Sequence, residues 1–228
     1  MESSALNHFQ NVVYIDGLNI RERYQAVLSC LGITSKPEKF DYTKFCSPAT
    51  GIAGKYFVIC PGAGYSSKCW EAEKFIQLTD RLLSKWNGHA VLVGSAAERD
   101  LCEQIRLTCK YPDRIKNASG ELTIPELFEQ IRQCDFLVTN DTGTCHIGAA
   151  IGIKTFIICG QGDYGSFVPY PPEWKNVHCI FSNRKCRCRL WNNEECCKQK
   201  VYPCIAEISV DDVWNNIKQH TEFKLEDL

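Results

Sequence analysis

The sequence predicts an α/β fold in which a parallel β-sheet is covered by helices on both faces. Short continuous apolar runs alternate with helical segments of ten or more residues from Lys55 onward. Continuous apolar runs are typical of strands that are buried on both sides, as in the sheets of βαβ units. Glycine-rich or small-residue turns follow several of these runs, where a strand would connect to a helix. Together these observations favour repeated βαβ units.

The expected strands and helices alternate in order along the chain. Apolar runs predict strands at 56–60, 90–94, 114–118, 135–139, 154–159 and 176–181. Apolar spacing predicts helices at 71–86, 97–109, 123–132, a small-residue helix after residue 142, and 208–217. Ligands of such sheets bind at the carboxyl ends of the strands. The loops after Cys60, Gly94, Thr139 and Cys159 are therefore the places to look for a site.

The chain divides by pattern into four parts. We expect an N-terminal connector with one short strand and a helix (1–54), a Rossmann-like α/β domain (55–182), a cysteine-rich basic loop (183–207) and a C-terminal helix and tail (208–228). Within the connector, 11–15 fits the strand, 20–31 fits the helix, and Gly32 is a plausible helix stop.

Length and composition indicate an ordinary soluble protein. The chain has 228 residues, of which 44% are hydrophobic and 23% charged. A formal net charge of -1 gives no reason to expect a surface that binds nucleic acid. We find no pattern of a signal peptide and no apolar run long enough to span a bilayer. The expected location is cytoplasmic.

Cysteines are numerous, at fifteen. Most lie inside apolar periodic segments, where a free cysteine behaves as a small buried hydrophobe. A cluster near the C-terminus could instead hold structural zinc, although its spacing differs from paired CxxC knuckles and ordinary reduced thiols are favoured. Its members are Cys186, Cys188, Cys196, Cys197 and Cys204.

The stretch 134–152 predicts an anion-binding site. It reads as a buried strand, a tight turn and the N-terminus of a helix that packs against the sheet. Such an N-terminus presents free N–H groups and the positive end of the helix dipole. We expect Asp141 to cap the helix, with Thr142, Gly143 and Thr144 in its first turn and His146 one turn in. The ligand would be a phosphate or diphosphate group.

Two further loops carry weaker signals. After the first strand, Gly62 and Gly64 allow close approach of the backbone, and Ser67 and Lys68 add a hydroxyl and a positive charge. This turn lacks the spacing of a Walker loop or a dinucleotide fingerprint, so alone it is equally typical of a plain strand-to-helix turn. After the second strand, Glu98 could accept from a ribose hydroxyl or, more simply, cap a helix.

These motifs, taken in order, resemble a known family. From about residue 20 to the C-terminus, the chain is similar to the second half of the bacterial heptosyltransferases of glycosyltransferase family 9. The matching motifs are Pro61-Gly62-Ala63, Lys68 with Trp70, Gly94-Ser95 with Glu98, Asp141-Thr142-Gly143 followed by His146, and Pro169-Tyr170. Their order and spacing are more specific than any one motif.

The resemblance implies a GT-B fold with two Rossmann-like domains, of which the C-terminal one binds the nucleotide sugar, ADP-heptose in characterised relatives. It implies inverting transfer to a hydroxyl of the lipopolysaccharide core or another glycan, with no metal or cofactor. Lys68 would contact phosphate or sugar, Glu98 the adenosine ribose, and Thr142, Gly143 and His146 the diphosphate. Where this chain has Thr144, the family usually has proline.

An acceptor-binding half is missing from the pattern. In the family the catalytic base comes from the N-terminal domain, and residues 1–54 are too few for a Rossmann-like half. We therefore name no catalytic residue; Asp16 is the one early carboxylate in a plausible turn. The alternatives are a non-catalytic nucleotide-sugar-binding domain, one half of a split enzyme with a separate acceptor-domain chain, or another GT-B enzyme such as a nucleotide-sugar epimerase.

Overall fold

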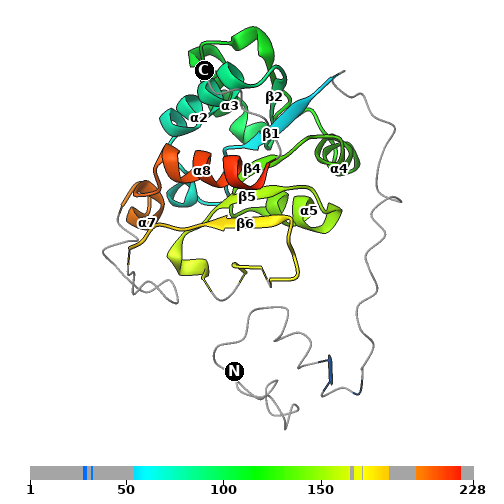
Figure 1. Cartoon of the computed structure of the whole chain (residues 1–228), viewed down its shortest axis with the longest axis vertical. Helices are drawn as coiled ribbons and strands as arrows, with labels where there is room; N and C mark the ends of the chain where they lie inside the picture. The colour runs from blue at the N-terminus through cyan, green and yellow to red at the C-terminus, as the bar shows by residue number, and fades with distance from the viewer. Residues whose placement is uncertain are drawn as a thin grey trace, which may run out of the picture.

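A six-stranded parallel sheet forms the centre of the protein (Figure 1). The computed structural model describes residues 28–29, 32, 54–164, 167–170, 172–184 and 199–221. The strand order is β3-β2-β1-β4-β5-β6, and every neighbouring pair is parallel. The chain therefore winds outward in one direction from β1 and in the other direction from β4, as in doubly wound α/β folds.

Helices and strands lie close to where the sequence predicts them. The strands are β1 (Tyr56–Cys60), β2 (His89–Leu92), β3 (Ile115–Asn117), β4 (Leu137–Asn140), β5 (Thr155–Ile158) and β6 (Val177–Ile180). The helices are α2 (Ala72–Lys85), α3 (Arg99–Thr108), α4 (Ile124–Arg132), α5 (Gly143–Ile151), α7 (Pro203–Ala206) and α8 (Val210–His220). Short 3₁₀ turns are η3 (Ser66–Lys68), η4 (Ala96–Glu98), η5 (Pro112–Arg114) and η6 (Gln161–Asp163).

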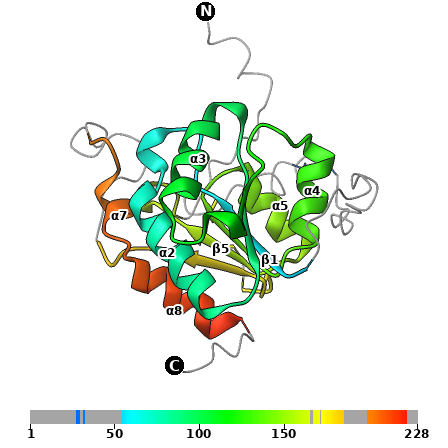
Figure 2. The ribbon, with the colours of Figure 1, turned by 90° about the horizontal axis from the view of Figure 1, so that it is seen from above.

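Helices cover both faces of the sheet (Figure 2). One face packs against α2, α3, α7 and α8, in a core that contains Phe57, Trp70 and Trp214. The other face packs against α4 and α5, in a core that contains Tyr56 and Ile131. All five residues of β1 are buried, which explains its unbroken apolar sequence. The expected α/β class with a parallel sheet is confirmed.

Local signals in the sequence set several helix ends. The expected capping box is present at α4, where the Glu126 carboxylate accepts from the N–H (2.8 Å) and the hydroxyl (2.7 Å) of Thr123. A second capping box, Ser209 with Asp212, starts α8 at Val210, two residues later than predicted. Gly152 ends α5 in the left-handed conformation with φ 89°.

The C-terminal part of the expected cysteine-rich loop is helical. Residues 203–206 form α7, where Cys204 and Ile205 are buried in the core, so the loop predicted over 183–207 ends earlier than expected. The other four cysteines of that cluster lie outside the described residues, as do the expected strand at 11–15 and Asp16. Leu28 and Ser29 are helical, and Gly32 has φ 75°, in agreement with a helix that stops there.

Described cysteines are free and mostly buried, as predicted for reduced thiols that pack as small hydrophobes. Burial raises the pKa of Cys60 to about 11 and that of Cys109 to about 12. These thiols therefore stay protonated at neutral pH.

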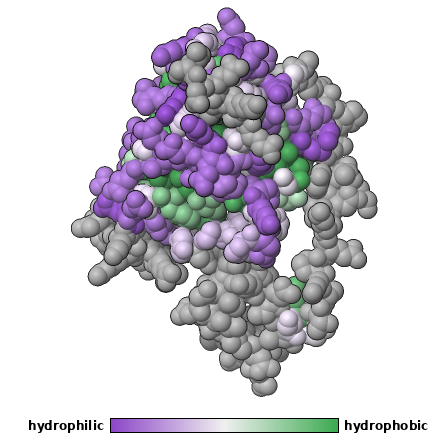
Figure 3. All heavy atoms as spheres, viewed as in Figure 1, coloured by the Kyte–Doolittle hydropathy of each residue, from purple (hydrophilic) through white to green (hydrophobic). Residues whose placement is uncertain are grey.

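The outer surfaces of α2 and α8 are mostly hydrophilic (Figure 3). Each of these helices is amphipathic and turns its apolar side to the core. Among the described residues, no helix has the length and apolar character needed to cross a bilayer.

Two histidines stack where α8 meets β6. The rings of His178 and His220 have centroids 3.8 Å apart, and His178 also stacks on Phe156 at 5.1 Å. Burial, with smaller contributions from His220 and Lys154, lowers the pKa of His178 to about 4 from an ordinary 6.5. The folded protein therefore holds His178 neutral where an unfolded chain would protonate it.

We expect the free energy of unfolding to fall as the pH drops from about 6.5 to about 4, because there the unfolded state binds a proton at His178 that the folded state does not. Urea unfolding at several pH values measures this. His178→Phe keeps a ring against Phe156 and removes the titrating group, so its stability should fall less over the same range. Parallel curves for the two proteins would contradict the prediction.

Candidate functional site

The candidate site lies where the winding of the sheet changes direction. β1 and β4 are neighbours, with Cys60 paired to Thr139, so their carboxyl ends open at the same edge. The chain leaves β1 toward one side of the sheet and leaves β4 toward the other side. Ligands of open α/β sheets usually bind at such a switch point, and we call the region between the loops after β1 and β4 the crevice.

Helix α5 begins in this crevice, but its cap differs from the prediction. The N-cap is Thr142, whose hydroxyl accepts from the N–H of Thr144 at 3.4 Å. Asp141 lies one residue earlier, in the turn, so its predicted capping role is wrong. Thr142 has extended backbone angles, which bring its short side chain over the first turn as an N-cap requires. Gly143 and Thr144 occupy the first turn as expected.

The N-terminus of α5 is suited to an anion by its charge. Its first turn contains no acidic residue, whereas α2, α3, α4 and α8 each have at least one in theirs. A carboxylate in the first turn would itself interact with the positive end of the helix dipole and repel an anionic ligand. Gly143 is exposed, and a Cβ placed on it would meet nothing within 4 Å. The backbone is therefore open to a ligand at the position where the dipole favours negative charge.

Small residues allow α5 to approach the sheet closely. A Cβ on Gly148 would lie 2.5 Å from Oγ1 of Thr155 and 2.8 Å from Leu137. The Thr144 side chain is buried, and its hydroxyl accepts from the Cys60 thiol at 3.4 Å. The hydroxyl of Thr144 thus contacts the carboxyl end of β1, and its expected place in a phosphate loop stays a prediction.

A buried asparagine joins the two loops of the crevice. Asn140, the last residue of β4, is 0% exposed. Its Nδ2 donates to the carbonyl oxygens of Pro61 (2.7 Å) and Gly62 (3.2 Å), and its Oδ1 accepts from the N–H of Trp70 (3.0 Å). The amide therefore fixes both ends of the loop after β1 against the start of the α5 loop. The sequence reasoning did not identify Asn140 as part of the site.

The Glu98 carboxylate lies between the loops after β1 and β2. Its Oε2 accepts from the N–H (2.6 Å) and hydroxyl (2.8 Å) of Ser95, which is the capping role considered from the sequence. Its Oε1 lies where a Cβ of Gly62 would be, at 1.5 Å, and Oε2 lies 2.9 Å from that of Gly94. Glu98 thus caps η4 and, at the same time, lies beside the crevice.

The turn that contains Lys68 is held by the C-terminal segment. Lys68 ends η3, and the carbonyl of Ser67 accepts from the N–H of Tyr202 at 2.9 Å. Two residues after Lys68, the indole of Trp70 donates to the carbonyl of Ile208 at 2.8 Å. Lys68 therefore lies on a turn that these hydrogen bonds hold in place, two residues before Trp70, which contacts Asn140.

His146 lies on the first turns of α5 and contacts the loop after β5. Its Nδ1 forms a short hydrogen bond with the hydroxyl of Tyr170, and the two ring centroids are 5.9 Å apart. Potential metal-ligand atoms of Asp141, Cys145 and His146 lie within 4.8 Å of one another. Burial, followed by the nearby Asp141, raises the pKa of the Cys145 thiol, which donates to Asp141 at 3.8 Å.

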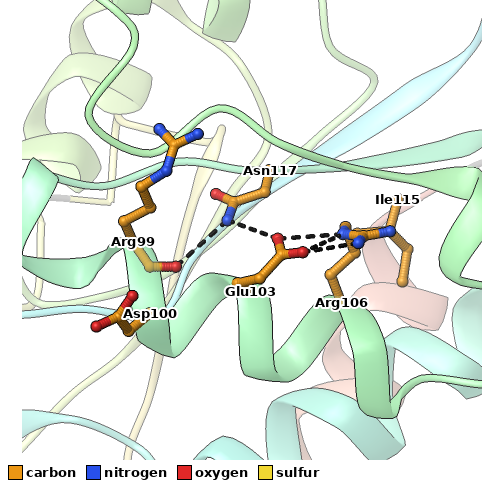
Figure 4. Close-up of a pocket in the computed structure, with 6 residues that line it drawn as sticks. All are labelled: Arg99, Asp100, Glu103, Arg106, Ile115 and Asn117. Atoms are coloured by element: carbon orange, nitrogen blue, oxygen red, sulfur yellow. Dashed lines mark hydrogen bonds and ion pairs between the residues drawn. The ribbon is translucent and has the colours of Figure 1, made fainter.

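A separate cavity of about 490 Å³ lies beside β3 and contains none of the predicted site residues (Figure 4). Its polar groups pair with one another: Asn117 donates to Glu103 (3.0 Å), and Arg106 forms an ion pair with Glu103 (2.7 Å). Bonds from Arg106 and Asn117 lower the pKa of Glu103 to about 2. Arg99 also donates to the carbonyl of Ser119 at 3.1 Å. We interpret this network as support for the turn after β3.

The structure brings most predicted site residues to one edge of the sheet. Asn140 connects the turn of Gly62 to the start of α5, and Glu98 contacts Gly62. Gly64 lies in the same turn, exposed, with nothing within 4 Å of an added Cβ. Sequence reasoning missed Asn140 and the contact of Tyr170 with His146, because their partners lie 24 to 79 residues away along the chain.

This fold is a Rossmann-like α/β domain, in which the N-terminus of α5 and the Glu98 carboxylate lie near the switch point of the sheet. The sequence specifies the class further. The chain belongs to glycosyltransferase family 9 (heptosyltransferase), whose family model matches residues 27–197, well over half of its length. The resemblance inferred from the motifs is confirmed.

Curated relatives agree with this family. Lipooligosaccharide heptosyltransferase 2 of Campylobacter jejuni is 29% identical over 182 residues, which cover 77% of this chain and 55% of the relative. Lipopolysaccharide heptosyltransferase 3 of Escherichia coli is 27% identical over 71% of this chain and 50% of its own length. The chain thus spans about half the length of the curated relatives it matches.

Solved structures share the fold. A glycosyl transferase family 9 protein from Veillonella parvula matches with a TM-score of 0.66 and 17% identity over 94% of this chain and 64% of that one. An E. coli heptosyltransferase with ADP-2-deoxy-2-fluoro heptose matches with a TM-score of 0.62 and 16% identity over 88% and 56% of the two chains. The expected fold class, a Rossmann-like half of a GT-B glycosyltransferase, is confirmed.

We expect Asn140→Ala to destabilise the protein by about 2–4 kcal/mol, since it leaves the Trp70 N–H and two carbonyls without this partner in a buried place. For a domain of this size that corresponds to a fall in Tm of roughly 5–15 °C. Thermal unfolding followed by circular dichroism measures it. The matched control is Asn216→Ala, which removes one 3.5 Å bond on the surface of α8; an equal effect of both changes would contradict the prediction.

We expect Gly62→Ala to displace the Glu98 carboxylate from Ser95, because the added Cβ would overlap Oε1. Loss of a helix cap costs about 1 kcal/mol, or roughly 2–4 °C in Tm. In a Glu98→Ala background the obstacle is gone, so the same Gly62→Ala change should cost almost nothing. A double-mutant cycle of Tm values tests this, and additive effects would contradict the contact.

Proposed function

We propose that this domain binds a nucleotide-diphospho-sugar, most specifically ADP-heptose, as the donor for glycosyl transfer. The observation that carries the proposal is the N-terminus of α5, which opens at the switch point of the sheet without an acidic residue in its first turn. A diphosphate is the anion that suits such a site in a family of nucleotide-sugar-dependent transferases. An E. coli relative of the same fold is described as bound to ADP-2-deoxy-2-fluoro heptose, which supports this choice of nucleotide and sugar.

In this proposal, each of the predicted site residues would contact a particular part of the donor. The N–H groups at Thr142 and Gly143 would bind the diphosphate, with Lys68 and His146 as cationic or hydrogen-bonding partners, and with Gly64 and Ser67 on the neighbouring turn. Glu98 would accept from the ribose of the adenosine, because its carboxylate lies beside Gly62 at the edge of the crevice. Asp141, in the turn directly before the N-cap of α5, would also line the nucleotide-sugar site.

The proposed reaction is inverting transfer to a hydroxyl of the lipopolysaccharide core or another glycan. The acceptor oxygen would lose its proton and replace the nucleoside diphosphate at the anomeric carbon. Fixed N–H dipoles, Lys68 and His146 would stabilise the charge on the leaving diphosphate, so the scheme uses no metal ion or cofactor. The base that removes the acceptor proton is not among the residues we name.

Transfer also needs an acceptor-binding half. Because the chain spans about half the length of its curated relatives, this half would be supplied by further sequence of a longer protein or by a separate chain. We propose a cytoplasmic location, peripheral at the inner membrane, where a lipid-linked glycan acceptor would be presented.

Isothermal titration calorimetry with ADP and ADP-heptose tests the donor site. We expect both to bind, and we expect Lys68→Met to weaken ADP by about 10- to 100-fold, because a charge-assisted bond contributes roughly 1.5–3 kcal/mol. Lys116→Met is the matched control, since Lys116 is exposed on β3, away from the crevice. EDTA should leave the affinity unchanged.

The outcomes separate the alternatives. If neither ligand binds, or if Lys68→Met and Lys116→Met behave alike, the donor-site assignment is wrong. If ADP-heptose binds but no acceptor is glycosylated when the acceptor-binding half is present, the domain is a non-catalytic binding module. Conversion of the sugar nucleotide to an epimer without any acceptor would identify a nucleotide-sugar epimerase.

A further inference from the structure

A contact between the loop after β5 and helix α5 goes beyond the donor-site residues named above. The Tyr170 hydroxyl and Nδ1 of His146 form a short hydrogen bond across 24 residues of sequence. Tyr170 is half-buried, and its ring also packs on Trp174 with centroids 5.4 Å apart. Val168, two residues earlier, is 0% exposed in the small core that contains Cys145. The phenol is therefore anchored on both sides, while His146 is exposed.

The chemistry of imidazole gives this bond a consequence for the anion site. In a neutral imidazole one ring nitrogen carries a proton and the other accepts a hydrogen bond. A phenol that donates to Nδ1 favours the tautomer with the proton on Nε2 and restricts rotation of the ring. Hydrogen bonding at one nitrogen commonly determines which task the other performs. In that tautomer, Nε2–H would be the group of His146 that donates to an anion at the helix N-terminus.

We propose that Tyr170 is a positioning residue of the donor site, which holds His146 in the Nε2–H tautomer and directs that N–H to the diphosphate. The inference rests on the proposed function, because it assigns the diphosphate to the N-terminus of α5. Tyr170 itself acts through His146 and need not touch the donor.

Another group could orient the same ring. The carboxylate of Asp141 has an oxygen within 4.8 Å of a His146 ring nitrogen and of the Cys145 sulfur. Cys145 competes only weakly with Asp141 for His146, because burial keeps the Cys145 thiol protonated and the thiol donates to Asp141. If Asp141 alone oriented His146, the loss of the Tyr170 hydroxyl would leave the tautomer unchanged. The two arrangements therefore differ in a measurable way.

Two readouts test the proposal on Tyr170→Phe, which keeps the ring that packs on Trp174. Long-range ¹H–¹⁵N spectra of histidine-labelled protein report the tautomer of each of the five histidines, with His146 assigned by its loss in His146→Asn. We expect the Nε2–H form in the unchanged protein and a mixture in Tyr170→Phe. Calorimetry should show ADP binding weakened about 3- to 10-fold, as expected for one hydrogen bond, with adenosine binding unchanged.

The matched control is Tyr164→Phe. Tyr164 lies in the same loop, and its ring packs on Phe181 instead of contacting His146. This change should leave the tautomer and both affinities as they are. In a His146→Asn background, Tyr170→Phe should have no further effect on ADP binding.

The inference is overturned if Tyr170→Phe leaves both the tautomer and the ADP affinity unchanged, or if adenosine is weakened as much as ADP. If Tyr170→Phe fails to fold, the spectrum of the unchanged protein decides, and an Nδ1–H tautomer there would overturn the proposal. If the unchanged protein does not bind ADP, the proposed function fails, while the tautomer measurement still reports whether Tyr170 fixes His146.

Discussion

The geometry of the crevice depends on one buried amide. Asn140 lies at the end of β4, where the connections that follow β1 and β4 leave toward opposite faces of the sheet. At such a point neighbouring backbone groups lose their strand partners, and buried groups without partners cost free energy. The side chain of Asn140 replaces those partners for Pro61, Gly62 and Trp70. One residue thereby fixes the distance between the turn that contains Gly62 and the start of α5, on either side of the proposed diphosphate.

The C-terminal helices also stabilise the loop after β1. Lys74 on α2 donates to the carbonyls of Ala206 and, at 3.2 Å, Ile208. Arg81 pairs with Asp211 at 2.5 Å and lies over the ring of Trp214 at 4.4 Å. The ion pair is exposed and contributes little by itself. The stacking and the buried apolar contacts hold α8 on α2, so the turn of Lys68 is braced by residues far along the chain.

The sequence predicted the sheet and its helices because apolar periodicity is a local signal. It predicted a strand, a turn and a helix N-terminus at 134–152 because that pattern is local too. What it missed is non-local. The N-cap of α5 is Thr142 and not Asp141, one residue later than predicted. The backbone angles decide which of the two residues caps the helix. Thr144 was expected to offer a hydroxyl, and in the structure that hydroxyl accepts from the thiol of Cys60 at the end of β1, 84 residues earlier in the chain. No spacing within the stretch 134–152 contains that information.

The same argument explains why the two loops with weak motifs proved to be related. A glycine after a strand and a glutamate at the start of a helix are each common. From the sequence, Glu98 is consistent both with a helix cap and with a ribose ligand. In the structure the carboxylate fills the space that Gly62 lacks a side chain to occupy, while Oε2 caps the helix through Ser95. The two roles are compatible because a carboxylate has two oxygens. The absence of a Cβ at Gly62 is therefore what allows an ordinary helix cap to reach the edge of the crevice.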